Sequence, residues 1–392
     1  MIAMNQPRKI CIVTGTRAEW GLLSPIARQL SARPDVRLQI VATNMHLDPR
    51  YGMTVNEIVA DGFTVDERVP IQPLGDSEAD RARAMSLCGL GMVDAFERLE
   101  PDMIVILGDR YEMLAVASVA TVMRIPVVHI AGGEITRGAI DDAIRHAITK
   151  MAALHLTSTD EYRNRVISMG ENPSRVITTG AIGVYNAMNE PLMTLAELEA
   201  SLGFELGDNT LLVTMHPTTM DPTDTRVHIE QLLKALDTAA RDCRILFTYP
   251  NNDARGAIII DMINDYAGRH PSRVHVVPSL GKVRYLSALR YVLAVVGNSS
   301  SGIVEVPSMK IPTVDIGNRQ AGRLAADSVI HCGTDSNEIS RALALALSER
   351  WQEKAKATVN PYYRNDTLSR IVNAITSTSL ESLRNKQFYD QP

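Results

Sequence analysis

Short apolar runs alternate with stretches of helical spacing along the first half of the chain. The apolar runs end at glycine or polar turns and predict strands at 9–15, 36–43, 103–107, 126–130, 154–157 and 176–179. Between them, apolar residues at helical spacing predict helices at 22–30, 112–123, 141–152 and 160–169. Near-continuous apolar strands separated by helices are typical of a parallel sheet that is covered on both faces.

The alternation pauses near Gly180 and then resumes. Residues 181–205 have no strand pattern and contain Asn, Pro and Gly, which favours a linker that leads into a helix. A second series then predicts strands at 210–215, 244–248, 274–277, 291–296 and 311–316, with helices at 227–241 and 282–289.

Two such series predict an α/β protein with two Rossmann-like domains that face each other across a cleft. The expected domains are residues 1–185 and residues 186–364, and a helix within about 365–392 is expected to pack back on the first. Ligands of open parallel sheets bind beyond the carboxyl ends of the strands. The turns that follow the predicted strands are therefore the place to look for chemistry.

Composition narrows the class of partner. The 392 residues are 45% hydrophobic and 22% charged, as in an ordinary globular protein, and the net charge of −5 gives no reason to expect a nucleic-acid partner. No apolar stretch reaches the roughly 18 residues that a membrane span needs, and the amino terminus is too short and polar for a secretory signal. Four well-separated cysteines form neither a zinc knuckle nor a CxxC pair. These features predict a cytoplasmic protein that binds neither nucleic acid nor membrane.

Two turns have the composition of phosphate-binding loops. In the turn at 14–21, a glycine opens a helix and Arg17 could clamp an anion, although a helix cap with a solvated arginine would have the same sequence. In the turn at 297–302, three small hydroxyl residues follow a very apolar run, and they are Ser299, Ser300 and Ser301. Glu305, one helical turn later, could bind ribose hydroxyls. A serine-rich turn can simply cap a helix, but its place after a buried strand favours a ligand site.

Charged residues follow two further strands and lie on a neighbouring helix. Asp109 and Arg110 come directly after the strand at 103–107, and Glu134 follows the strand at 126–130. In the predicted helix at 141–152, Asp142, Arg145 and His146 have spacings that place them on one face. Taken alone, such a helix usually presents a solvated charged face.

The second series adds a histidine and two arginines. His216 ends a predicted strand just before Pro217, and Arg319 and Arg323 follow the strand at 311–316. The chain lacks a GxSxG elbow, a cluster of metal ligands and a dinucleotide fingerprint. The remaining inventory favours acid–base chemistry on a phosphorylated substrate, with no cofactor and no metal.

Seven motifs, in the same order along essentially the whole chain, resemble those of the hydrolysing UDP-N-acetylglucosamine 2-epimerases. They are GTRA at 15–18, GDRYE at 108–112, HIAGGE at 129–134, GAIDDAIRHAITK at 138–150, HPT at 216–218, GNSSSG at 297–302 and GNRQAGR at 317–323. The long match at 138–150 is the most specific. One departure is Glu19-Trp20, where the family usually has Asp-Tyr, which either is neutral or tunes the sugar pocket.

The resemblance implies a GT-B-type fold, a homo-oligomer (dimer or tetramer) and a reaction that releases UDP and N-acetylmannosamine for sialic-acid-type synthesis. A carboxylate removes the C2 proton as UDP leaves, and water then adds to the 2-acetamidoglycal. By the matching positions, Asp109 and Glu134 are implied as acid–base residues, with Asp141 or Asp142 as a third carboxylate. Arg110 and His216 are implied to stabilise the leaving group. The implied ligands of the UDP-sugar are Arg17, His146, Ser299, Ser300, Ser301, Glu305, Arg319 and Arg323.

Three alternatives stay open from the sequence. A GT-B glycosyltransferase would use a similar cleft but leave carbon 2 untouched. A close epimerase acting on UDP-N,N′-diacetylbacillosamine, on the route to legionaminic acid, would share the phosphate and carboxylate features. A UDP-sugar sensor would bind without turnover, which the many carboxylates in the turns disfavour.

Overall fold

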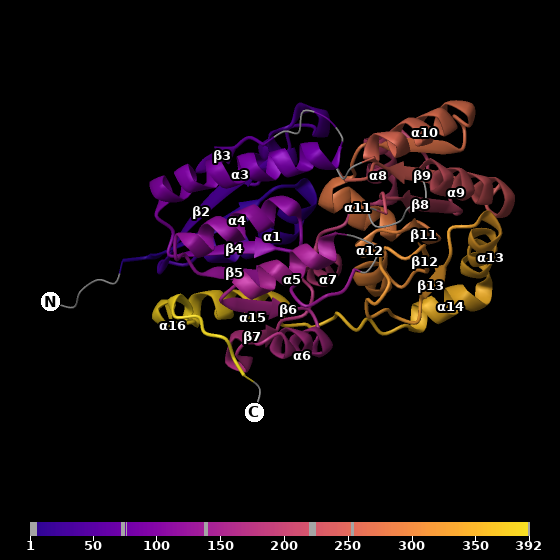
Figure 1. Cartoon of the computed structure of the whole chain (residues 1–392). Coiled ribbons are helices and arrows are strands. Elements are labelled where there is room, and N and C mark those ends of the chain that lie inside the picture. The colour runs from indigo at the N-terminus through magenta and orange to yellow at the C-terminus, as the bar shows by residue number, and fades with distance from the viewer. Residues whose placement is uncertain are drawn as a thin grey trace. The chain divides into compact units, whose positions relative to one another are not determined.

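The computed structural model describes residues 6–71, 75, 77–136, 140–218, 225–251 and 255–390. The chain forms two compact units (Figure 1). Unit 1 comprises Met1–Glu134, Asp141–Ile182 and Arg364–Pro392, and unit 2 comprises Ile135–Ile140 and Gly183–Tyr363. The first two residues of the motif at 138–150 lie outside the described residues. Within the described ranges, no helix has the length and apolar character that crossing a membrane requires.

Unit 1 is built on a seven-stranded parallel sheet in the order β3-β2-β1-β4-β5-β6-β7. Its strands are β1 (Arg8–Thr14), β2 (Val36–Thr43), β3 (Glu67–Val69), β4 (Met103–Leu107), β5 (Val127–Ile130), β6 (Leu154–Thr157) and β7 (Val176–Thr178). The strand order reverses between β1 and β4, and at such a switch point the turns diverge and leave room for a ligand.

Helices cover the sheet of unit 1, and α3, α4 and α5 pack side by side (Figure 1). The helices are α1 (Arg17–Ser31), α2 (Val55–Ala60), α3 (Glu78–Leu99), α4 (Tyr111–Val122), α5 (Asp141–Met151), α6 (Asp160–Ser168), α15 (Thr367–Ser377) and α16 (Leu380–Arg384), with short 3-10 helices at Asn44–Leu47, Pro49–Tyr51 and Pro173–Arg175. The carboxyl-terminal α15 packs on α1, and the Arg8 guanidinium donates a hydrogen bond to the Ile375 carbonyl at 2.8 Å.

Unit 2 contains a six-stranded parallel sheet in the order β10-β9-β8-β11-β12-β13. Its strands are β8 (Thr210–Thr214), β9 (Arg244–Thr248), β10 (Val274–Val277), β11 (Ala294–Gly297), β12 (Thr313–Ile316) and β13 (Val329–Cys332). Its helices are α7 (Ile182–Asn189), α8 (Leu195–Leu202), α9 (Thr225–Ala239), α10 (Gly256–Arg269), α11 (Gly281–Leu289), α12 (Ser300–Val304), α13 (Ser336–Leu347) and α14 (Glu349–Ala357), with a 3-10 helix at Val306–Met309.

The two faces of this second sheet bury separate cores. Leu211 and Val213 of β8 pack into one hydrophobic cluster, whereas Leu212 between them belongs to another. Successive side chains of a strand point to opposite faces, so one apolar strand serves both layers of helices. This explains why the strands show continuous rather than alternating apolar sequence.

The prediction of two parallel-sheet α/β domains is confirmed, and several details differ. The predicted linker at 181–205 contains α7 and α8, and a capping box between Thr194 and Glu197 starts α8. The strand predicted from residue 291 begins at Ala294, because Tyr291 and Val292 still donate backbone hydrogen bonds to the Ala288 carbonyl in the last turn of α11. The last predicted helix is two helices, since Ser379 caps a new one.

Candidate active site

Three turns at the carboxyl ends of neighbouring strands carry the charged motifs of unit 1. The turn after β1 contains Gly15, the turn after β4 contains Asp109, and the turn after β5 leads to Glu134. Strands β1, β4, β5 and β6 are consecutive in the sheet, so their turns lie next to one another. Parallel strands deliver their carboxyl ends to one edge, which gathers residues that are far apart in sequence.

Arg145 of α5 is the centre of this group. Its side chain is only 1% exposed, and its guanidinium forms an ion pair with the Asp109 carboxylate. The same guanidinium donates to the backbone carbonyl of Glu134 at 3.0 Å and lies 3.7 Å from the Asp142 carboxylate. A planar guanidinium can make several hydrogen bonds in fixed directions. Arg145 therefore joins the β4 turn, the β5 turn and the first turn of α5.

Glu134 is held by a hydroxyl from the next strand end. Its side chain is 5% exposed, and its Oε1 accepts a hydrogen bond from the Ser158 hydroxyl at 2.8 Å. The preceding Gly133 has φ +81°, and a β-carbon there would lie 2.6 Å from the Tyr162 carbonyl oxygen. The turn needs glycine for both reasons. Sequence reasoning missed Ser158, which has no distinctive motif around it.

His129 supports the turn that carries Asp109. Its Nε2 lies 2.7 Å from the Gly108 carbonyl oxygen, which can only accept, so Nε2 carries the proton. The Nδ1 atom faces the Thr149 hydroxyl at 3.3 Å. Burial lowers the pKa of His129 to about 3 and keeps the ring neutral. The histidine fixes the backbone just before Asp109, a role that the motif at 129–134 did not reveal.

The first turn of α5 carries the remaining acidic candidates. Asp141 begins the helix, and Asp142 lies 3.8 Å from Nε2 of His146. Burial lowers the pKa of the half-buried His146, and the neighbouring Asp142 partly opposes that shift. These contacts of Asp142 with Arg145 and His146 are the ones that their helical spacing predicts.

Arg17 and Arg110, the two arginines of unit 1 that are expected to contact the phosphates, have carboxylate partners within unit 1. Arg17 opens α1, and its Nε donates to the Glu57 carboxylate at 2.8 Å. Arg110 precedes α4, and its Nε donates to Oε1 of the fully buried Glu112 at 3.0 Å. Such a partner fixes the direction of the remaining guanidinium donors. Glu112 was not among the predicted site residues.

Glu112 and Glu19 enclose the Gly15 turn. Glu19 Oε2 accepts the Gly15 and Thr16 amides at 2.6 and 3.1 Å, while a β-carbon at Gly15 would lie 2.5 Å from Glu112 Oε1. Burial, reinforced by the charge of Glu112 and opposed by Arg110, raises the pKa of Glu19 to about 8. Arg110 therefore lies near two buried carboxyl groups, Glu19 and Glu112. The raised pKa favours a proton on Glu19 at neutral pH.

The Glu19-Trp20 departure has a structural explanation. Glu19 completes a capping box with Thr16 at the start of α1. Trp20 is buried, donates from its indole to Asp61 at 2.7 Å and packs edge-on against Phe63. Both side chains thus stabilise the β1 turn and α1 from within unit 1.

The turns of unit 2 are organised by a buried amide. Asn298, after β11, accepts the His216 backbone amide at 2.7 Å and donates to the His216 carbonyl at 2.9 Å. The backbone amide of Asn251 donates a hydrogen bond to Nδ1 of His216 at 3.2 Å, so the ring proton is on Nε2. Arg319 and Gln320 both donate to the Asn298 carbonyl, at 3.1 and 2.8 Å. Asn298 and Gln320 were missed because buried amides give no sequence signal.

The serine turn of unit 2 leads into the short helix α12. Ser299 precedes the helix and Ser300 begins it. The Ser301 hydroxyl lies 2.5 Å from the Tyr285 hydroxyl of α11, and burial raises the pKa of that tyrosine. Glu305 follows α12 and lies against the backbone of Gly183, where any side chain would collide with its carboxylate.

Arg323 contacts the segment that unit 2 takes from the first half of the chain. Its guanidinium donates to the Thr136 hydroxyl at 3.4 Å. Within the described part of the chain, no three His, Cys, Asp or Glu side chains gather as metal ligands would.

The strand ends of unit 1 combine carboxylates, a positioned arginine and a neutral histidine, and such an arrangement can perform acid–base chemistry. A family model described as UDP-N-acetylglucosamine 2-epimerase matches residues 28–376. The chain belongs to this family of UDP-sugar 2-epimerases.

Curated relatives match nearly the whole chain. The GDP/UDP-N,N′-diacetylbacillosamine 2-epimerase (hydrolyzing) of Campylobacter jejuni is 38% identical over 98% of this chain and 99% of its own. The polysialic acid biosynthesis protein P7 of Escherichia coli is 35% identical over 98% of both chains. The UDP-N,N′-diacetylbacillosamine 2-epimerase (hydrolyzing) of Legionella pneumophila is 34% identical over 87% of this chain and 89% of its own.

Solved structures share the fold at low sequence identity. The UDP-GlcNAc 2-epimerase of Neisseria meningitidis, solved bound to UDP-GlcNAc, has a TM-score of 0.79 at 17% identity and covers 94% of this chain and 100% of its own. The Methanocaldococcus jannaschii enzyme, in complex with UDP-GlcNAc and UDP, has a TM-score of 0.74 at 17% identity over 94% and 100% of the two chains. These neighbours are of the GT-B type that the motifs implied.

Proposed function

We propose that the enzyme is a hydrolysing UDP-N-acetylglucosamine 2-epimerase, which converts UDP-N-acetylglucosamine and water to UDP and N-acetylmannosamine. The observation that carries this proposal is the Arg145 network, which holds Asp109 and the Glu134 backbone together at adjacent strand ends in a chain of the epimerase family. Removal of a weakly acidic proton at carbon 2 needs a positioned base, and expulsion of UDP needs stabilisation of the departing phosphate.

The acid–base work is assigned to the carboxylates of unit 1. Asp109 and Glu134 act as the acid–base pair, with Asp141 or Asp142 as the third carboxylate and His146 as a sugar ligand. One carboxylate takes the C2 proton while the C1–O bond to UDP breaks, which gives the 2-acetamidoglycal. Water then adds its hydroxyl to C1, and a proton returns to C2 with inverted configuration. Positioned acids and bases typically contribute about 10²–10⁴-fold each.

The diphosphate and uridine are assigned to the remaining residues. Arg17, Arg110 and the Nε2 proton of His216 would stabilise the departing phosphate, because each offers a donor whose direction a protein contact fixes. Ser299, Ser300, Ser301, Arg319 and Arg323 would bind the diphosphate, and Glu305 would accept hydrogen bonds from the ribose hydroxyls.

A second substrate has a specific observation in its favour. Two relatives at 38% and 34% identity are named as hydrolysing epimerases of N,N′-diacetylbacillosamine nucleotides. That sugar differs from N-acetylglucosamine at carbons 4 and 6, away from the carbon that epimerises. The 35% identical relative named for polysialic acid biosynthesis favours the N-acetylglucosamine substrate instead.

Side-by-side turnover of the two UDP-sugars tests the assignment. We expect UDP release with N-acetylmannosamine as the sugar product from UDP-N-acetylglucosamine, and a much lower kcat/KM for the diacetylbacillosamine nucleotide. A higher kcat/KM for the diacetylbacillosamine nucleotide would instead identify that sugar nucleotide as the substrate. Absence of UDP release from both would refute hydrolytic epimerisation.

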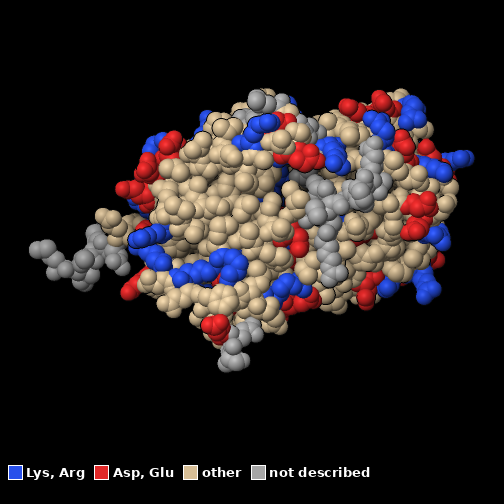
Figure 2. All heavy atoms as spheres, in the orientation of Figure 1, with Lys and Arg blue, Asp and Glu red and all other residues tan. Residues whose placement is uncertain are grey.

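The enzyme is also proposed to be a cytoplasmic homo-oligomer. Few charged side chains lie over α3 and α4 on the face shown in Figure 2. Leu90 of α3 is 70% exposed and Val122 of α4 is 84% exposed, which favours coverage by a second copy. The described cysteines are all unpaired, as a reducing compartment maintains them. Leu90→Glu should lower the molar mass measured by light scattering. A parent protein that already has the mass of a monomer would contradict the oligomer.

A further inference from the structure

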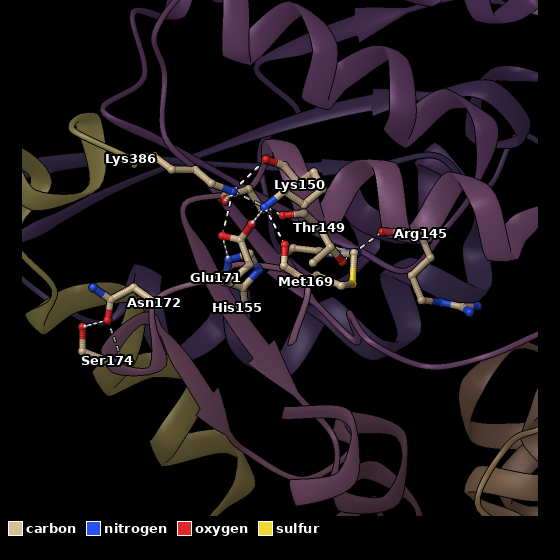
Figure 3. A network of polar contacts seen from close by, with 11 residues as sticks. Arg145, Thr149, Lys150, His155, Met169, Glu171, Asn172, Ser174 and Lys386 are labelled. Atoms are coloured by element: carbon tan, nitrogen blue, oxygen red, sulfur yellow. Dashed lines mark hydrogen bonds and ion pairs between the residues drawn. The ribbon is translucent and has the colours of Figure 1, made fainter. Parts of the chain in front are cut away.

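A second polar cluster of unit 1 lies on the opposite end of α5 from its acidic first turn, and no role has been assigned to it (Figure 3). Its centre is Glu171, whose side chain is only 3% exposed. Lys150 and Lys386 form ion pairs with its carboxylate at 2.6 and 2.8 Å, and Nε2 of the buried His155 lies 3.0 Å away. Burial alone would raise the pKa of Glu171, but these three partners lower it to about 2. The carboxylate therefore stays charged across the working pH range.

Lys386 comes from the segment that follows the last helix, α16. Besides Glu171, its ammonium donates to the carbonyl oxygens of Lys150 at 2.7 Å and Ala152 at 2.6 Å, with Thr149 further away at 3.4 Å. The last carbonyls of a helix have no partner within the helix, and a cation placed there satisfies them and interacts favourably with the helix dipole. One side chain thus caps the carboxyl end of α5.

Two further contacts hold this carboxyl-terminal segment in place. The Tyr389 amide donates to the Gly170 carbonyl at 3.0 Å, and the Lys150 ammonium lies 4.8 Å from the centre of the Phe388 ring. The ring also covers Gly170, where a β-carbon would collide with it. The segment is therefore fixed both to α5 and to the turn that precedes Glu171.

The capped helix is the one that carries Arg145. The Arg145 backbone carbonyl accepts a hydrogen bond from the Thr149 hydroxyl at 3.0 Å, whereas the Arg145 side chain extends away from Lys386 (Figure 3). Lys150 follows Arg145 by five residues, which corresponds to about 7.5 Å of helix rise. A shift of α5 as a whole would therefore move the guanidinium that joins Asp109 to the Glu134 backbone.

We propose that the carboxyl-terminal segment Lys386–Tyr389 is a clamp that positions α5, and that Lys386 is a positioning residue for the acid–base carboxylates. The segment contacts the carboxyl end of α5 and the turn at Gly170 and Glu171, and it acts through the helix that holds Arg145. This inference rests on the proposed function, because its main readout is turnover. Misplacement of a catalytic group by about 1 Å can cost roughly 10²-fold in rate.

Lys386→Met tests the clamp because it keeps the length of the side chain and removes the charge. We expect kcat to fall about tenfold or more with KM little changed, since positioning affects the transition state more than ground-state binding. Lys386→Arg should restore most of the rate, and Lys356→Met, at an exposed lysine of α14, should leave it unchanged. Because Phe388 is 66% exposed, Phe388→Ala should fold normally and give a smaller loss of kcat.

Amide hydrogen exchange provides a readout that does not depend on the substrate. Lys386→Met should accelerate exchange in the second half of α5 while α1 and α4 stay protected. Full kcat in folded Lys386→Met, or unchanged exchange in α5, would overturn the clamp. If the parent enzyme releases no UDP, the proposed function fails, while the exchange result still decides whether Lys386 orders α5.

Discussion

The strand ends of the two units differ in what holds them. In unit 1, an ion pair between the buried Arg145 and the partly buried Asp109 joins α5 to the turn after β4. In unit 2, the neutral side-chain amide of Asn298 bonds to the His216 backbone, and the Asn298 backbone carbonyl accepts a hydrogen bond from the Arg319 guanidinium. Buried charges are costly unless they are paired, and a reaction that needs a charged group is one reason to keep them. The contrast supports the proposal that the carboxylates of unit 1 transfer protons, while unit 2 binds UDP and His216 stabilises the departing phosphate.

The largest expected effect is the loss of turnover when the Glu134 carboxylate of unit 1 is replaced. Glu134→Gln should reduce turnover by roughly 10²–10⁴-fold, because the amide cannot exchange the C2 proton. The affinity for UDP, measured by calorimetry, should stay unchanged, since Gln can still accept the Ser158 hydrogen bond. Glu353→Gln, at an exposed residue of α14, is the matched control. Parent-like turnover of Glu134→Gln would break the division between the units.

Loss of Arg145 should destabilise the protein as well as inactivate it. Arg145→Met leaves the Asp109 carboxylate, which is 22% exposed, without its partner. Removal of one member of a fully buried pair typically costs about 3–5 kcal/mol, and we expect a loss below that range because water can reach Asp109. Urea unfolding followed by circular dichroism measures this loss. Arg341→Met, at an exposed position of α13, should change the midpoint little. Equal midpoints for the two variants would mean that Arg145 contributes no such buried pair.

The corresponding change in unit 2 should be milder and affect binding. Asn298→Ala removes two hydrogen bonds to the His216 backbone, each group left unpaired costing about 1–3 kcal/mol. We expect UDP affinity to fall by about tenfold, with a smaller change in kcat. Unchanged affinity for UDP in a folded Asn298→Ala variant would contradict a role of this turn in binding UDP.

The last expected effect is a dependence of folding stability on pH that comes from Glu19. Its folded pKa of about 8 lies above the ordinary value of 4.5. Between these values the folded protein holds a proton that the unfolded chain has released, so this group lowers stability as pH rises from about 4.5 to 8. Glu19→Gln should make that decline smaller. The measurement is the urea midpoint of unfolding at pH 5 and at pH 8, for the parent protein and the variant. An identical pH slope in the variant would contradict a protonated Glu19.

The sequence predicted the two parallel sheets because buried parallel strands leave a periodic apolar signal. Strand β3 has only three residues, and α3 exposes Leu87 and Leu90 beside its buried positions, so neither gave a clear period. Helix length and strand pairing depend on tertiary contacts that no local window contains.

The candidate residues at strand ends could be named from sequence, but their supports could not. The spacing of Asp142, Arg145 and His146 predicted a shared face, yet nothing indicated that Arg145 is buried. Ser158 and Lys386 reach their partners only because the fold brings distant segments together. Such contacts depend on topology rather than on local pattern.

Turnover of UDP-N-acetylglucosamine in deuterated water tests the central claim most directly. Elimination followed by hydration breaks the C2–H bond and delivers a solvent proton to carbon 2. The account predicts UDP and N-acetylmannosamine that carries one deuterium at C2, as measured by NMR and mass spectrometry. Release of a sugar that retains its original C2 hydrogen would contradict epimerisation and would support glycosyl transfer or simple hydrolysis instead.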